Sequence, residues 1–136
     1  MSRATATAPF TITGWEETTV VEDGGLRLYR THVSKRFGGD LQGESVADMT
    51  MVTIGGRPVA YGGFEHVSGS LGGRAGSFVL HHNAANGLEG GLSLTVVPSS
   101  GTGELAGLRG SARIEIAGQV GDTSAAHALV LDYTLD

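Results

Sequence analysis

The chain contains no cysteine, which excludes disulfides, thiolate nucleophiles and thiolate metal sites. Lys35 is the single lysine, and nine basic residues face fourteen acidic ones, a net charge of −5. No basic cluster could follow a phosphate backbone or an anionic bilayer, so we expect neither nucleic acid nor a membrane as a partner. Apolar runs stay short of the ~20 residues of a membrane span, and the first ten residues lack a signal peptide's apolar segment. We therefore expect a cytoplasmic protein, which the missing cysteines also suit.

Proline is scarce, with 3 residues, whereas glycine is abundant, with 23 of the 136. The glycines follow no three-residue period, which excludes collagen, and 40% hydrophobic residues exclude a disordered chain. Each glycine inside a helix costs roughly 1 kcal/mol relative to alanine, so this spread favours short strands joined by turns. We expect one domain over residues 1–136, in which residues 1–6 are candidates for fraying.

Eight segments alternate with turn residues and are expected to be strands. The expected hairpin turns include Gly24-Gly25, Gly55-Gly56 and Gly72-Gly73. Consecutive strands with short turns predict an all-β fold, a single antiparallel up-and-down barrel of about eight strands, filled by side chains or holding one small ligand. The expected strands are 7–21 (bent at Gly14), 26–37, 41–54, 58–71, 75–82, 91–97, 108–117 and 126–135.

Two strings are typical of a known family: GSFVL at Gly76–Leu80 and SGTGELAGL at Ser100–Leu108. In both, the chain resembles a bacterial family of small barrel proteins of unknown function, similar in fold to allene oxide cyclase. The resemblance covers most of the chain, and it implies the barrel without implying an activity. The family usually has Gln at the position of His81, so the chain departs from it near the end of the fifth strand.

Glu65 is the first candidate for chemistry. Strand alternation places it on one face with Tyr61, Gly63 and Val67. If that face is the barrel interior, desolvation raises the pKa of Glu65, which would then be a general acid or base. The alternative is a structural carboxylate that is paired with an interior arginine such as Arg30 and locks the barrel.

His82 is the second candidate. It shares a face with Phe78 and Leu80, whereas His81 points to the opposite face, so the two histidines cannot chelate one ion from a regular strand. A zinc site would need His32, Glu65 and His82 together, and we expect no metal. The sequence also lacks nucleotide and flavin motifs, so we expect no cofactor.

Counting outward from the turn at Gly72-Gly73 places Glu65 and His82 near the same end of the barrel, about one residue pair apart. Tyr133 could turn its hydroxyl toward the same cavity mouth. The candidate catalytic residues are therefore Glu65, His82 and Tyr133, and the candidate ligand-binding residues are Met49, Tyr61, Phe78 and Leu80.

Three functions remain open for such a barrel. It could bind a small apolar or amphipathic molecule, it could be a cofactor-free isomerase or cyclase, or it could be a structural or interaction barrel with a filled interior. An open interior cavity separates the first two from the third. Because both faces of some strands carry apolar residues, we also expect a homo-oligomer, with a dimer slightly ahead of a trimer.

Overall fold

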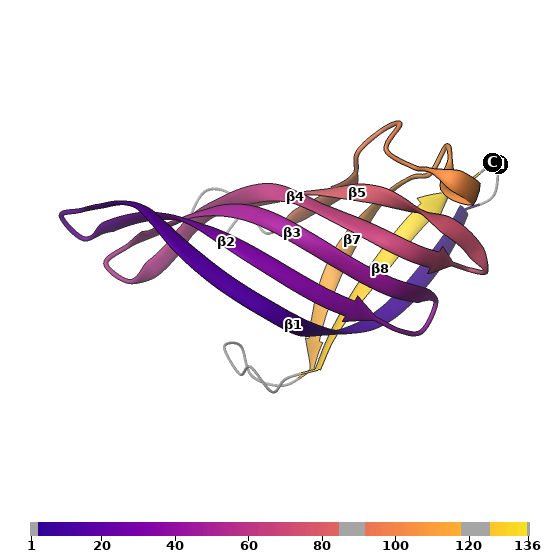
Figure 1. Ribbon diagram of the computed structural model, residues 1–136, viewed down its shortest axis with the longest axis horizontal. Helices are drawn as coiled ribbons and strands as arrows, with labels where there is room; N and C mark the ends of the chain where they lie inside the picture. The colour runs from indigo at the N-terminus through magenta and orange to yellow at the C-terminus, as the bar shows by residue number, and fades with distance from the viewer. Residues whose placement is uncertain (1–2, 85–91, 118–125, 136) are drawn as a thin grey trace.

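The computed structural model describes residues 3–84, 92–117 and 126–135. Eight antiparallel strands follow one another in chain order, and β1 pairs with β8 to close the barrel (Figure 1). Within these residues, one 3-10 turn, η2 (Gly103–Leu105), is the single helical element, and no helix could cross a membrane. The predicted all-β barrel is confirmed. Its strands are β1 (Arg3–Asp23), β2 (Leu26–Phe37), β3 (Leu41–Ile54), β4 (Arg57–Leu71), β5 (Arg74–Ala84), β6 (Ser93–Val96), β7 (Arg109–Ala117) and β8 (Ala126–Thr134).

The three glycine pairs form the expected hairpin turns, and each pair has positive φ at both residues. Amino acids that carry a side chain adopt such φ values only at a cost in conformational energy, which is why glycine occupies these turns. The bounds of β2 and β3 match the prediction. β1 begins earlier than predicted, because residues 3–6 pair with β8 and so extend the strand. β6 is shorter than predicted, and Pro98, which cannot donate to a ladder, follows it closely.

A bulge in β1 changes which residues face inward. The pairing with β2 shifts between Ile12 and Gly14. Before the shift Phe10 lies opposite Phe37, and after it Trp15 lies opposite Val33. Because the extra residue reverses the alternation, even-numbered residues face inward before the bulge and odd-numbered residues face inward from Trp15 to Thr19. A second shift between Thr19 and Val21 reverses the alternation again. The predicted bend at Gly14 marks this place.

The barrel has one filled end. A cluster of large buried side chains packs there, where η2 folds against β5. Thr102 N–H donates to the Ser77 carbonyl at 2.8 Å, and Glu104 accepts a hydrogen bond from Ala75 N–H at 3.2 Å. The segment around Thr102 and Glu104 is therefore held against β5 at this end by hydrogen bonds. The cluster comprises Ala6, Ala8, Phe10, Phe37, Leu41, Val67, Leu71, Phe78, Leu80, Leu94, Val96, Leu105, Leu108, Leu129 and Leu131.

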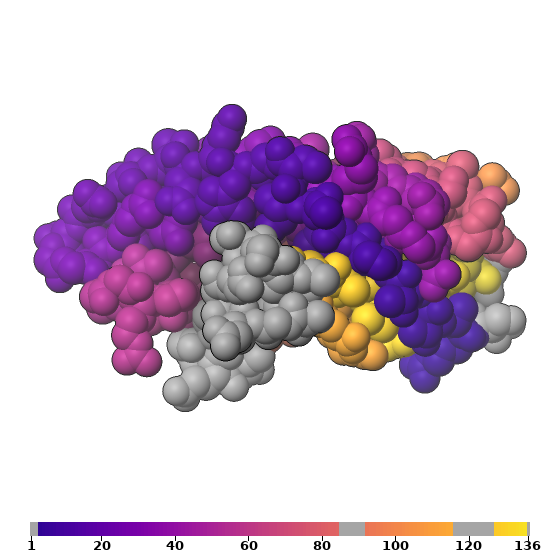
Figure 2. All heavy atoms as spheres, turned by 90° about the horizontal axis from the view of Figure 1, so that it is seen from below, coloured from indigo at the N-terminus to yellow at the C-terminus, as the bar shows by residue number. Residues whose placement is uncertain are grey.

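At the other end, the barrel extends into an arm. β1 pairs with β8 only over Arg3–Phe10, and β4 pairs with β5 only from Tyr61 onward. Among the described residues, the rest of β1 and β4 pair only with β2 and β3, which also pair with each other. Figure 1 shows them projecting to the left beyond β7 and β8, and in Figure 2 they are the indigo, violet and pink spheres at the left. The inner face of this end carries a small hydrophobic cluster of buried residues, Val33, Ala47 and Met49.

Candidate functional site

A cavity of about 380 Å³ lies at the base of the arm, next to the filled core. Its wall is mostly apolar, with polar side chains at Thr31, Lys35, Tyr61, His82 and His127. Methionine, aromatic and β-branched side chains form the wall, which suits an apolar ligand body. The lining residues are Phe10, Ile12, Trp15, Thr31, Val33, Lys35, Ala47, Met49, Met51, Tyr61, His82, Leu92, Ile114 and His127.

Glu65 is the centre of a buried polar cluster beside this cavity. Its Oε1 lies 2.7 Å from His82 Nε2 and 3.3 Å from Lys35 Nζ. Its Oε2 accepts a hydrogen bond from Ser45 Oγ at 2.5 Å. All four residues are buried, so water does not compete for these contacts. We call these four residues the polar cluster.

Four neighbouring strands supply the polar cluster, one residue each. Lys35 on β2 lies directly across from Ser45 on β3. Ser45 pairs with Val67 on β4, and Glu65 lies two residues before Val67 on the same inward face. His82 on β5 pairs with Gly63, which is again one inward-facing position from Glu65. The offset predicted from the hairpin turn is confirmed, because His82 lies two residues beyond Leu80, the partner of Glu65. Diagonal neighbours on one face of paired strands are within reach of long side chains.

Gly63 allows the strands to come this close. Its φ is +157°, and a Cβ there would collide with the Asp48 carbonyl oxygen and lie 2.9 Å from Met49 Sδ. Gly63 lies between Met49 and His82 in the strand pairing. Because it has no side chain, the inner face has room between the thioether and the imidazole.

The carboxylate of Glu65 is held in its charged form. Burial raises its pKa, but the hydrogen bond with His82, the charge of Lys35 and the Ser45 hydroxyl outweigh that effect and lower the pKa to about 2. The sequence-based expectation of a raised pKa was wrong, because it considered desolvation without these partners. At neutral pH Glu65 therefore accepts hydrogen bonds and is not itself poised to exchange a proton.

The state of Glu65 fixes the hydrogen-bonding role of His82. A charged carboxylate can only accept, so His82 Nε2 must carry a proton and donate it. The other ring nitrogen, Nδ1, is buried and has no hydrogen-bond partner among the described residues. In the neutral imidazole this nitrogen has a free lone pair, and His82 lines the cavity.

Tyr61 lies next to His82, with ring centroids 6.2 Å apart. Burial, together with the negative charge of Glu65, raises the pKa of Tyr61 to about 12. Its hydroxyl therefore keeps its proton under ordinary conditions. It gives the cavity wall a neutral polar edge.

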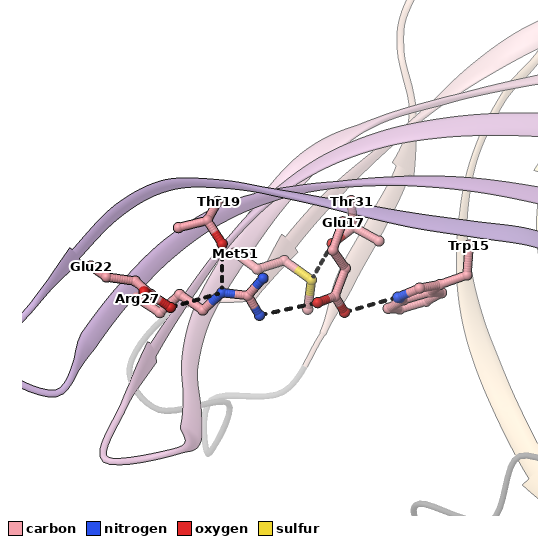
Figure 3. A network of polar contacts seen from close by, with 7 residues as sticks. All are labelled: Trp15, Glu17, Thr19, Glu22, Arg27, Thr31 and Met51. Carbon is pink, nitrogen blue, oxygen red and sulfur yellow. Dashed lines mark hydrogen bonds and ion pairs between the residues drawn. The ribbon is translucent and has the colours of Figure 1, made fainter.

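A second network holds the mouth of the cavity (Figure 3). Trp15 Nε1 donates to Glu17 at 2.9 Å, and Arg27 donates to the other oxygen of Glu17 at 3.0 Å and to Thr19 at 3.1 Å. The Arg27 guanidinium lies 4.0 Å from the centre of the Tyr29 ring. The hydrogen bonds of Trp15 and Arg27 lower the pKa of Glu17. These contacts fix the half-exposed Trp15 indole at the edge of the cavity.

Met49 and Tyr61 line the cavity as the sequence placed them, but three other predicted residues lie elsewhere. Phe78 and Leu80 face inward, yet they pack within the filled core. Tyr133 also packs against that core, with its hydroxyl beside Gly72 at the hairpin end of β4 and β5. Its predicted place at the same mouth was wrong, because β8 crosses the barrel so that Tyr133 pairs with Ala4 at the filled end.

The predicted partner of Glu65 was also wrong. Arg30 points outward and pairs with the exposed Asp48 at 2.6 Å. The interior cation is Lys35, which alternates on β2 with the buried Val33 and Phe37. That alternation, read together with Lys35 being the one lysine, could have identified it. The expected opposite orientation of the two histidines is confirmed, since His81 stacks outside on Phe64 with ring centroids 4.9 Å apart.

A metal centre has no support in the described part of the chain. No group of three His, Cys, Asp or Glu side chains there could hold an ion. His32, one of the three ligands considered from the sequence, is exposed on the outer face of β2. The polar cluster instead holds its carboxylate with a lysine, a serine and a histidine.

Comparisons with known proteins agree with this fold. A crystal structure of a DUF3224-family protein of unknown function from Shewanella oneidensis MR-1 is similar, with a TM-score of 0.75 and 30% sequence identity over 99% of both chains. No curated protein matches the sequence. The model of the family described as "Protein of unknown function (DUF3224)" matches residues 6–132, so the chain belongs to the DUF3224 family.

Proposed function

We propose that this protein binds a small apolar or amphipathic molecule in the cavity at the base of the arm. The observation that carries the proposal is a cavity of about 380 Å³ with a mostly apolar wall, in which Thr31, Lys35 and His82 are the buried polar residues. Cavities of this size hold drug-sized ligands, and a few polar groups fix their orientation. A structural barrel would instead fill its interior with side chains, as this chain does at its other end.

The single tryptophan gives a direct test of ligand binding. Trp15 lines the cavity mouth, so an apolar probe such as N-phenyl-1-naphthylamine should quench or shift its fluorescence. Ala47→Leu fills part of the cavity and should weaken probe binding about tenfold or more. Val46→Leu is the matched control, because Val46 precedes it on β3 and is exposed on the outer face. Equal binding by both variants and the native protein would contradict the proposal.

Three further expectations belong with this proposal. The outer face of β3 and β4 exposes Val46 and Phe64, which supports a homo-oligomer. The absence of cysteine supports a cytoplasmic location. The closed eight-stranded barrel supports the predicted likeness to the allene oxide cyclase fold, which transfers no activity to this chain.

A further inference from the structure

We propose that the polar cluster gives the cavity a catalytic activity, the isomerisation of small enolisable ketones by proton transfer at His82 Nδ1. The substrate class is a β,γ-unsaturated ketone with an apolar body. This inference rests on the proposed ligand site and adds chemistry to it. It uses only groups of the chain, without a metal or cofactor.

His82 Nδ1 is the proton acceptor because it is the ring nitrogen of His82 that has no hydrogen-bond partner among the described residues. The ring is buried, and its Nε2 is committed to Glu65 at 2.7 Å. Nδ1 has no partner among the described residues although the ring lines the cavity. A buried nitrogen without a hydrogen-bond partner is unfavourable, so a ligand group that binds it would relieve that cost.

Glu65 positions the imidazole and does not serve as the base. Its two oxygens are already used, one by His82 and Lys35 and the other by Ser45. A carboxylate on one ring nitrogen fixes the tautomer and stabilises the imidazolium that forms when the other nitrogen takes a proton. Glu65 is therefore a positioning residue for His82.

Lys35 supplies positive charge where negative charge develops. Its ammonium lines the same cavity and contacts the same Glu65 oxygen as His82. Of its three N–H donors, the contact with Glu65 occupies one. An enolate oxygen formed beside His82 would lie near this cation in a setting with little water, where such stabilisation is strongest.

The reaction balances within the site. The Cα–H bond of the ketone breaks, its proton goes to His82 Nδ1, and its electron pair forms the enolate, whose oxygen faces Lys35. The imidazolium then returns the proton to Cγ, and the double bond moves into conjugation with the carbonyl. Nothing is oxidised or reduced, and the neutral imidazole is restored.

The probe 3-cyclohexen-1-one tests this chemistry, because its conjugated product absorbs in the ultraviolet. We expect the native protein to accelerate its isomerisation above the rate with the same concentration of free imidazole. His82→Gln should lower that rate by about 10²-fold or more, the usual contribution of a general base. His81→Gln is the matched control, since the neighbouring ring stacks on Phe64 outside the barrel and its loss should leave the rate unchanged.

Trp15 fluorescence separates the two proposals. If the probe quenches Trp15 and the native rate equals that of His82→Gln, the ligand site stands and the catalytic role is overturned. If the probe neither quenches Trp15 nor reacts, the proposed binding function fails for this ligand class as well.

A measurement on the native protein covers the case in which His82→Gln does not fold. ¹⁵N-histidine spectra should show an unprotonated Nδ1 in His82 at neutral pH, and that signal should shift when phenol, a stable enol mimic, is added. A protonated Nδ1, or one that phenol leaves unmoved, would overturn the proposal.

Discussion

Lys35 and Glu65 show at the level of single residues how the barrel tolerates charge inside. Their side chains are only 9% and 1% exposed and lie 3.3 Å apart. Glu65→Gln leaves the Lys35 ammonium buried without a counter-charge, so we expect a loss of about 3–5 kcal/mol in the free energy of unfolding. Urea denaturation at pH 7 measures this loss.

The double variant Glu65→Gln/Lys35→Met is the control for that experiment. It removes both charges, so it should be more stable than Glu65→Gln alone. If the double variant is the less stable of the two, Lys35 is not the partner that makes the loss of Glu65 costly.

The lowered pKa of Glu65 also predicts a dependence of stability on pH. Its pKa is about 2 in the folded protein, against an ordinary value of 4.5. A carboxyl group with a depressed folded-state pKa stabilises the protein above the unfolded pKa, and this contribution is lost as pH falls through the folded pKa. The free energy of unfolding should therefore fall between about pH 5 and pH 2 more steeply in the native protein than in Glu65→Gln. Parallel slopes in the two proteins would refute this.

Alanine substitutions at the neighbouring Gly63 and Gly62 should differ in their effect on stability. Gly63→Ala places a Cβ against the Asp48 carbonyl at a φ of +157°, so we expect it to cost about 1–3 kcal/mol and to weaken probe binding in the cavity. Gly62→Ala meets only the His82 carbonyl oxygen at 3.5 Å, an ordinary contact, and should cost much less. Thermal unfolding of both variants checks this, and equal losses would contradict the close approach at Gly63.

Among the strands, the arm differs from the closed part of the barrel. Beyond Gly14, β1 pairs only with β2 among the described residues, whereas Arg3–Phe10 pairs with β8 in the closed part of the barrel. Strands with fewer neighbours open at lower free energy. Amide hydrogens in Glu16–Asp23 should therefore exchange faster than those of β2 near Phe37. Uniform protection along both strands, measured by hydrogen exchange and NMR, would count against a separate arm.

The strands also show what the sequence could predict and what it could not. Double glycines at tight turns and strict alternation in β2, β3 and β4 were enough for strand bounds, for the inward Glu65 and for its neighbour His82. Alternation describes one strand at a time, so it could not show that β8 carries Tyr133 to the filled end. It also could not detect the bulge at Ile12/Gly14 that turns Trp15 toward the cavity. Alternation on β2 marks Lys35 as inward-facing, but its contact with Glu65 joins β2 to β4 across β3, which a pattern along one strand does not contain.

For the whole molecule, the exposed apolar residues on the outer face predict self-association. Phe64 is 55% exposed and Val46 is 47% exposed, and one face of the Phe64 ring stacks on His81. We expect light scattering at micromolar concentration to give the mass of a dimer, with a trimer as the second possibility. Phe64→Glu should shift the protein to a monomer without unfolding it. A native monomer would show that this face needs no partner.

The central claim is that a small apolar molecule occupies the cavity beside the polar cluster. The chain has three methionines, and two of them, Met49 and Met51, line that cavity. In a ¹³C-methyl-methionine spectrum, N-phenyl-1-naphthylamine should shift both of these signals and show nuclear Overhauser contacts to them. If Met49 and Met51 show neither shifts nor contacts at a saturating probe concentration, the cavity is not a ligand site.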